Sequence, residues 1–106
     1  MADISDIGNL LGIEHRKALR TRLLCYLDQK YPGTTTADLL YACDNDTSEN
    51  DIDRELAYLE EKHLIQRHAP RAGKVLANKI TARGRDFLDG HISEVGLTSP
   101  EIYRGK

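Results

Sequence analysis

Residues 44–66, DNDTSENDIDRELAYLEEKHLIQ, decide the fold, because they predict a capped amphipathic helix that runs directly into a β-strand. Thr47 or Ser48 can cap the start of this helix, and Ser48, followed three residues later by Asp51, approximates a capping box. Apolar residues recur along it at helical spacing and predict one stripe that faces a core. They are Ile52, Leu56 and Leu59. This helix is the element against which the other segments must pack.

Upstream of it the sequence predicts two further helices. Residues 14–30 place leucines on one face and end before Pro32 and Gly33, which stop a helix. Residues 34–36 are threonines, which predict caps for a short helix over residues 37–43. Residues 1–13 form an N-terminal segment in which two glycines make helix formation marginal. Two short helices joined by a polar linker are typical of a helix-turn-helix.

Downstream, residues 64–68 and 75–80 predict two strands, joined by a turn in which Pro70 and Gly73 lie. Thr81 predicts the cap of a last helix over residues 82–89, and Gly90 its end. Residues 91–106 lack a clear period and predict an extended tail. The fold class is therefore α+β, mostly α: a winged helix-turn-helix with a three-helix core, a two-stranded β-wing and a C-terminal helix over residues 14–90.

Length and composition indicate one ordinary globular domain. The chain has 106 residues, of which 40% are hydrophobic and 30% charged, and its net charge is −2. No apolar run approaches the roughly 20 residues that cross a bilayer, so we expect no membrane association. The N-terminus is acidic and lacks the pattern of a secretion signal, which predicts a cytoplasmic protein.

The charges are divided along the chain. Residues 44–61 hold eight acids against the single base Arg54, whereas residues 67–85 hold six bases and no acid. The start of the first long helix adds further bases. A basic wing suits phosphate contact, but several carboxylates on the third helix repel phosphates. The acidic helix therefore indicates a possible protein partner as well.

Two stretches resemble winged-helix proteins of the ArsR, MarR and PadR type. Residues 51–67, DIDRELAYLEEKHLIQR, are similar to their third helix leading into the wing. Residues 80–90, ITARGRDFLDG, are similar to the "LTxxGRxxL" segment that closes the wing and starts the last helix. With the tail GHISEVGLTSP, residues 90–100, the chain also resembles a small winged-helix protein of Mu-like phages and prophages.

The resemblance implies a transcriptional regulator of phage or bacterial origin that binds double-stranded DNA, with the third helix in the major groove and the wing along the backbone. Carried over by position, the residues that face the groove would be Glu49, Asn50, Asp53, Arg54, Ala57 and Tyr58, and of these we expect Asn50, Arg54 and Tyr58 to contact DNA. On the wing, the side chains that suit phosphate contact are Arg67, His68, Arg71 and Lys74. Such regulators commonly form homodimers, for which the N-terminal segment and the tail offer apolar surface. The alternative is a winged-helix interaction module, for phage assembly or DNA packaging, that binds a protein through its acidic helix and does not bind DNA.

Metal binding is disfavoured by the sequence. Cys25 and Cys43 stand alone on different helices, where buried thiols are expected, and the histidines are scattered. The loop from Asp44 supplies several acids at the spacing of a calcium loop, but Glu49 lies where that loop requires glycine. We therefore expect neither a metal site nor a cofactor.

Catalysis is disfavoured as well. No nucleophile has a neighbouring base, and no glycine-rich loop could cradle a phosphate. The carboxylates of Asp51, Asp53 and Glu55 alternate along a helix that we expect to expose them to water. The sequence thus predicts a binding protein and not an enzyme.

Overall fold

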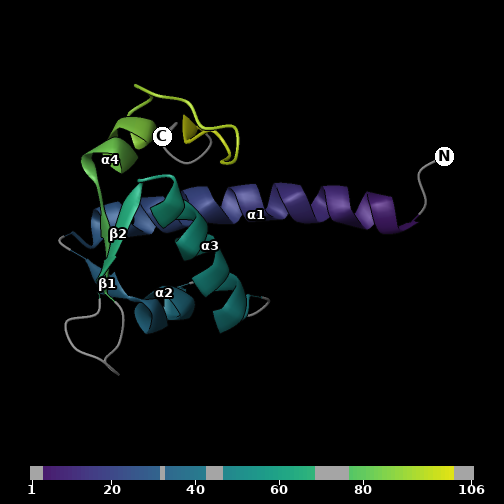
Figure 1. The fold of residues 1–106 in the computed structure, drawn as a ribbon, viewed down its shortest axis with the longest axis horizontal. Coiled ribbons are helices and arrows are strands. Elements are labelled where there is room, and N and C mark those ends of the chain that lie inside the picture. Colours follow the sequence, from purple (N-terminus) through teal and green to yellow (C-terminus); the bar gives the residue numbers. More distant parts are fainter. Residues whose placement is uncertain (1–3, 32, 43–46, 69–76, 102–106) are drawn as a thin grey trace.

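A computed structural model gives the fold and describes residues 4–31, 33–42, 47–68 and 77–101. This part of the chain is a small α+β domain, mostly helical, with a three-stranded antiparallel sheet. Its elements in order are α1 (Ile4–Gln29), β1 (Thr34–Thr35), α2 (Thr36–Ala42), α3 (Glu49–Glu61), β2 (Ile65–His68), β3 (Ala77–Ile80) and α4 (Ala82–Leu88) (Figure 1).

Helix α3 forms as its sequence predicts. The Ser48 side-chain oxygen accepts a hydrogen bond from the Asp51 amide at 3.1 Å, which confirms the expected cap. The three residues of the apolar stripe are fully buried: Ile52, Leu56 and Leu59. The helix ends at Glu61 with Lys62 as its C-terminal cap, and His63 takes a left-handed conformation with φ of 65°, which turns the chain toward β2.

Helix α1 is longer than predicted. It runs without interruption for 26 residues, where the sequence indicated a helix only from residue 14. Glycine costs about 1 kcal/mol of helix stability relative to alanine. Gly8 and Gly12 therefore weaken the first turns but, unlike a proline, do not break the hydrogen-bond ladder. At about 1.5 Å per residue the helix is roughly 39 Å long, and its N-terminal turns extend beyond the other elements (Figure 1).

The sheet contains a strand that the sequence did not reveal. Residues 34–36 were expected only as helix caps, but Thr34 and Thr35 form β1, which pairs with β3. The strand order is β1-β3-β2, all antiparallel, so the expected two-stranded wing is part of a three-stranded sheet. Thr35 also has the expected capping role, because its side chain accepts from the Asp38 amide at 3.1 Å.

Strands β2 and β3 pair in a register that opposes Ile65 to Ile80 and Arg67 to Asn78. Both isoleucines are buried, whereas Gln66, on the opposite face of β2, is exposed. The sheet therefore has an inner face toward the helices and an outer face toward water. The predicted turn between the strands lies outside the described residues.

Helix α4 also follows its prediction. The Thr81 side chain accepts from the Gly84 amide at 3.1 Å, and Gly90, with φ of 85°, adopts the left-handed conformation expected just past the helix end. Phe87 and Leu88 are buried. A side chain at residue 84 would overlap the backbone oxygen of Leu64, just before β2, and the side chain of Ile80 in β3, so glycine is required for α4 to lie this close to the sheet.

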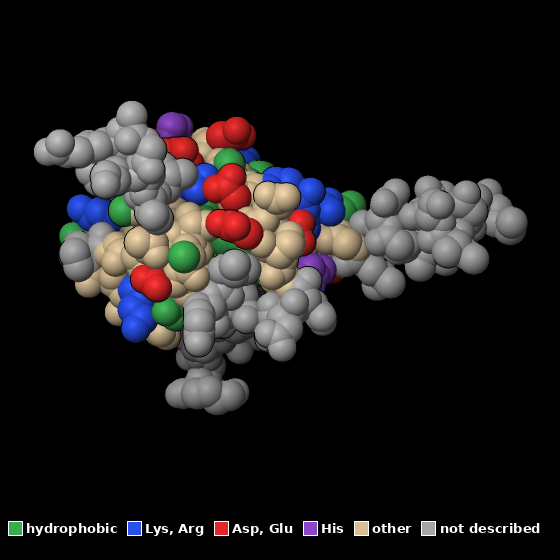
Figure 2. Space-filling model, turned by 90° about the horizontal axis from the view of Figure 1, so that it is seen from below, with side chains coloured by type: hydrophobic (Ala, Val, Ile, Leu, Met, Phe, Trp, Pro, Cys, Tyr) green, Lys and Arg blue, Asp and Glu red, His purple; other side chains and the backbone are tan. Residues whose placement is uncertain are grey.

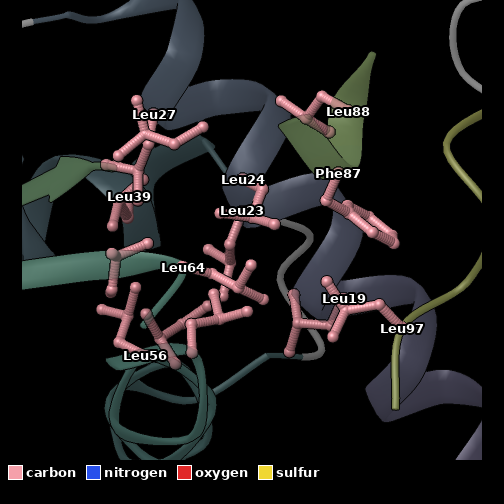
Figure 3. Close-up of a cluster of buried hydrophobic side chains, with 14 residues drawn as sticks. Leu19, Leu23, Leu24, Leu27, Leu39, Leu56, Leu64, Phe87, Leu88 and Leu97 are labelled. Atoms are coloured by element: carbon pink, nitrogen blue, oxygen red, sulfur yellow. The ribbon is translucent and has the colours of Figure 1, made fainter. Parts of the chain in front are cut away.

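Leucines from all these helices meet in one core (Figure 3). Leu97, from the predicted tail, joins them with only 4% of its surface exposed. Thr21 of α1 donates its hydroxyl to the Thr98 carbonyl at 2.6 Å, and the Thr98 amide donates to the Lys17 carbonyl at 3.2 Å, so this part of the predicted tail packs against α1. Within the described part of the chain, no helix has both the length and the apolar content that a bilayer crossing demands.

Candidate nucleic-acid interface

The outward face of α3 carries two of the residues expected to contact DNA. Asn50 and Arg54, one turn apart, are both exposed, and Ala57 continues the same stripe opposite the buried leucines. Arg54 bonds to the carboxylate of Glu55 at 3.2 Å and lies 3.5 Å from that of Asp51. Its side chain remains 62% exposed, so these ion pairs hold it only loosely.

Glu55 is not exposed, contrary to expectation. Only 1% of its side chain is accessible, and its carboxylate accepts a hydrogen bond from Arg20 of α1 at 2.7 Å. The sequence held a signal for this position: Glu55 lies three residues after Ile52 and four before Leu59, at the edge of the buried stripe. Its negative charge is therefore offset inside the protein by Arg20.

Tyr58 lies on the same flank of α3 and is half-buried. The Arg20 guanidinium stacks over its ring, 3.7 Å from the centroid, and Lys62 lies 5.7 Å from it. The Tyr58 hydroxyl approaches Gly96 so closely that a Cβ at residue 96 would collide with it. Tyr58 was expected to contact DNA, but this packing makes it a link between α3, α1 and the C-terminal residues.

Arg67 is turned inward from the wing. Its guanidinium donates to the Asp53 carboxylate at 2.6 Å and to the Asn78 side-chain oxygen at 2.9 Å, and only 8% of its side chain is exposed. We expected Arg67 to face phosphates, but a neighbouring carboxylate of α3 engages it instead. Its backbone amide also donates to the Glu60 carboxylate at 3.2 Å.

Asn78 is a key residue that the sequence pattern did not single out. It is fully buried and donates from its amide to the Thr34 carbonyl at 3.3 Å and to the Thr36 hydroxyl at 3.2 Å. It thereby joins β1, α2 and, through Arg67, β2. The sequence did hold a signal: Asn78 lies two positions before Ile80 in the predicted strand, so both side chains point to the inner face of the sheet.

The remaining expected DNA contacts fall at the wing. His68 is exposed at the end of β2, while Arg71 and Lys74 lie outside the described residues. On α1, partly exposed Arg16 borders a shallow groove between α1 and α3 of about 510 Å³, which Arg20, Arg54 and Tyr58 also line. Acidic and basic side chains lie next to one another on the face seen in Figure 2.

The histidine, cysteine and acidic side chains considered as metal ligands do not form a cluster in the described part of the chain. Among the residues that the structure describes, no three histidine, cysteine or acidic side chains cluster in a way that could hold an ion. Cys25 is a half-buried free thiol, and burial, reinforced by the negative charge of Asp28, raises its pKa above the ordinary value. Cys43 falls outside the described part.

Comparison with known proteins adds no relative: no family model matches the chain, and no curated protein or solved structure matches it.

Proposed function

We propose that this chain is a winged-helix protein that binds double-stranded DNA, as a transcriptional regulator of phage or bacterial origin. The order of elements supports this assignment, because α2 and α3 follow one another and lead into a hairpin that lies beside α3. In such an arrangement α3 enters the major groove and the β2–β3 hairpin follows the backbone.

The observation that carries the proposal is the outward stripe of α3. Asn50 and Arg54 stand one turn apart, and arginine and asparagine are the side chains that pair most specifically with guanine and adenine edges. The acidic residues beside Asn50 and Arg54 oppose DNA binding less strongly than the sequence indicated. Asp53 is engaged by Arg67 and Glu55 by Arg20, so their charges are partly offset within the protein.

Phosphate contacts would come from the wing and from α1. His68 is exposed, and Arg71 and Lys74 follow it in the sequence between the two strands. Arg16 on α1 borders the groove beside Arg54. Arg16 and His68 lie on α1 and β2, two elements that both contact α3, and positioning contacts on a duplex come from side chains beside the reading helix.

A second candidate is an interaction module that docks a basic protein and does not bind DNA. It is favoured by the exposed acids that remain on α3, namely Glu49, Glu60 and Glu61. The withdrawal of Arg67 from the wing surface also favours it, since that arginine was one of the expected phosphate contacts.

The two candidate functions can be separated by selecting, from a pool of random DNA duplexes, the sequences that the protein binds. DNA recognition predicts an enriched sequence, and Arg54→Ala or Asn50→Ala should relax the preference at single positions and cost about 1–3 kcal/mol on the preferred site. Arg83→Ala, which removes the same charge from α4, should leave the preference unchanged. An absence of enrichment, or the same preference with both α3 variants, would favour the interaction module.

A further inference from the structure

Two exposed cations in the described part of the chain lack a carboxylate partner and lie outside the residues that were expected to contact DNA. Among the described residues, ion pairs engage Lys17, Arg20, Arg54, Lys62, Arg67 and Arg83. By contrast, no ion pair in this part of the chain involves Lys79 of β3 or Arg85 of α4, and both are exposed. Both lie against the ring of Tyr31, which follows α1. We call these three residues the Tyr31 patch.

The geometry of the Tyr31 patch leaves an aromatic ring open to solvent between two cations. The Lys79 ammonium and the Arg85 guanidinium are each 5.4 Å from the centroid of the ring. Tyr31 is 52% exposed. Cation–π contacts at exposed sites contribute little, so a ligand that stacks on the ring or pairs with the cations can replace them at small cost.

The patch continues onto the outer face of the sheet. A groove of about 570 Å³ runs beside Lys79 and is lined by polar side chains that include Gln66 and His68 of β2. Glu60 is the acid that lines it, and its carboxylate already accepts the Arg67 amide. The groove therefore places polar side chains next to Lys79, one of the two cations of the Tyr31 patch.

We propose that the Tyr31 patch and this groove bind single-stranded nucleic acid. The two cations suit consecutive phosphates, and an exposed tyrosine ring stacks on a base regardless of its identity. Only an unpaired base can do so, because a duplex covers the faces of its bases with neighbouring pairs. An acidic peptide without aromatic residues would pair with the cations but has no aromatic group to stack on the ring. The Tyr31 patch shares no residue with the surface proposed for duplex DNA, although the groove shares His68 with it, so binding at the patch does not depend on duplex binding.

The test is the binding of a labelled oligothymidine, followed by fluorescence anisotropy at low salt with the full chain. Tyr31→Ala should weaken binding by about 5- to 100-fold, while Tyr31→Phe, which keeps the ring, should bind as the wild type does. Lys79→Gln and Arg85→Gln should each flatten the salt dependence by about 0.7 units. All three positions are exposed, and thermal melting checks that each variant is folded.

Matched controls separate this surface from the one proposed for duplex DNA. Arg54→Ala should leave oligothymidine binding unchanged, and Tyr31→Ala should leave duplex binding unchanged. Polyglutamate should compete poorly with the oligonucleotide. Binding that is insensitive to Tyr31→Ala, displacement by polyglutamate as readily as by oligothymidine, or no binding by the wild type would each overturn the proposal, whether or not duplex binding is found.

Discussion

Arg20 of α1 and Glu55 of α3, 35 residues apart in the sequence, are joined by a 2.7 Å hydrogen bond between the guanidinium Nε and a carboxylate that is 1% exposed. Arg20 also stacks on Tyr58 and donates to the Gly96 carbonyl at 2.8 Å. One side chain thus fixes α1, α3 and the C-terminal residues together. Because these contacts hold the Arg20 guanidinium inside the domain, its positive charge is directed toward protein groups and not toward solvent.

Removing Glu55 should therefore destabilise the fold. Glu55→Ala leaves Arg20 without its carboxylate, and breaking a buried pair in this way costs about 3–5 kcal/mol. Urea denaturation followed by circular dichroism measures the loss. Glu61→Ala, on the exposed face of the same helix, is the control and should change stability by less than about 0.5 kcal/mol. If Glu55→Ala and Glu61→Ala unfold at the same urea concentration, the pair of Arg20 and Glu55 contributes nothing to stability.

Two glycine substitutions should act in opposite directions. Gly84→Ala would overlap the Leu64 backbone and place a methyl group 2.7 Å from Cγ1 of Ile80, so we expect a loss of about 1–3 kcal/mol. In Gly12→Ala, in α1, the added Cβ would lie 3.6 Å from a guanidinium nitrogen of Arg16, which is an ordinary contact, and the substitution should stabilise the helix by up to about 1 kcal/mol. Thermal unfolding of both variants distinguishes them. A stable Gly84→Ala protein would contradict the close approach of α4 to Leu64 and Ile80.

The Cys25 thiol should resist alkylation. Its pKa is raised by burial and secondarily by Asp28, so in a Cys43→Ser background its rate of reaction with iodoacetamide should rise only above the ordinary thiol pKa of about 8.5. Asp28→Asn should shift that profile to lower pH, because it removes the neighbouring negative charge. A midpoint at or below the ordinary value would contradict the buried position.

The raised pKa of Cys25 also determines whether the folded state gains or loses stability as pH rises. The folded state retains the Cys25 proton to a higher pH than the unfolded chain does, because its pKa is raised. The stability that Cys25 contributes is therefore complete below the ordinary thiol pKa and is lost as pH rises through the higher folded value. The decline in the urea midpoint over this window should be smaller for Cys25→Ser than for the wild type.

The local features of the fold could be predicted from the sequence because their causes are local. The Ser48 and Thr81 caps, the stripe through Leu56 and the stop at Gly90 each depend on residues a few positions apart. Strand β1 could not be predicted, because two threonines carry no alternating pattern and their partner strand, β3, lies far along the chain.

The candidate site was harder to predict than the fold for a related reason. Arg67 and Glu55 each pair with a residue from another element, so their partners are set by which helices and strands meet in the tertiary structure. The sequence showed an acidic helix and a basic wing, but not that Asp53 would engage Arg67. The exposure of Tyr31 between Lys79 and Arg85 likewise depends on the meeting of three elements.

The most direct test of the proposed DNA-binding surface is the salt dependence of affinity for a random duplex, measured for the wild type and for the Arg71→Ala, Lys74→Ala double variant. Arg83→Ala, which removes a charge from α4, is the control. We predict a steep fall of affinity with salt for the wild type and a slope about two units flatter for the double variant, because each substitution removes one cation that pairs with a phosphate. A wild-type protein that does not bind duplex at about 50 mM salt, or a slope that both wing substitutions leave unchanged, would contradict the account.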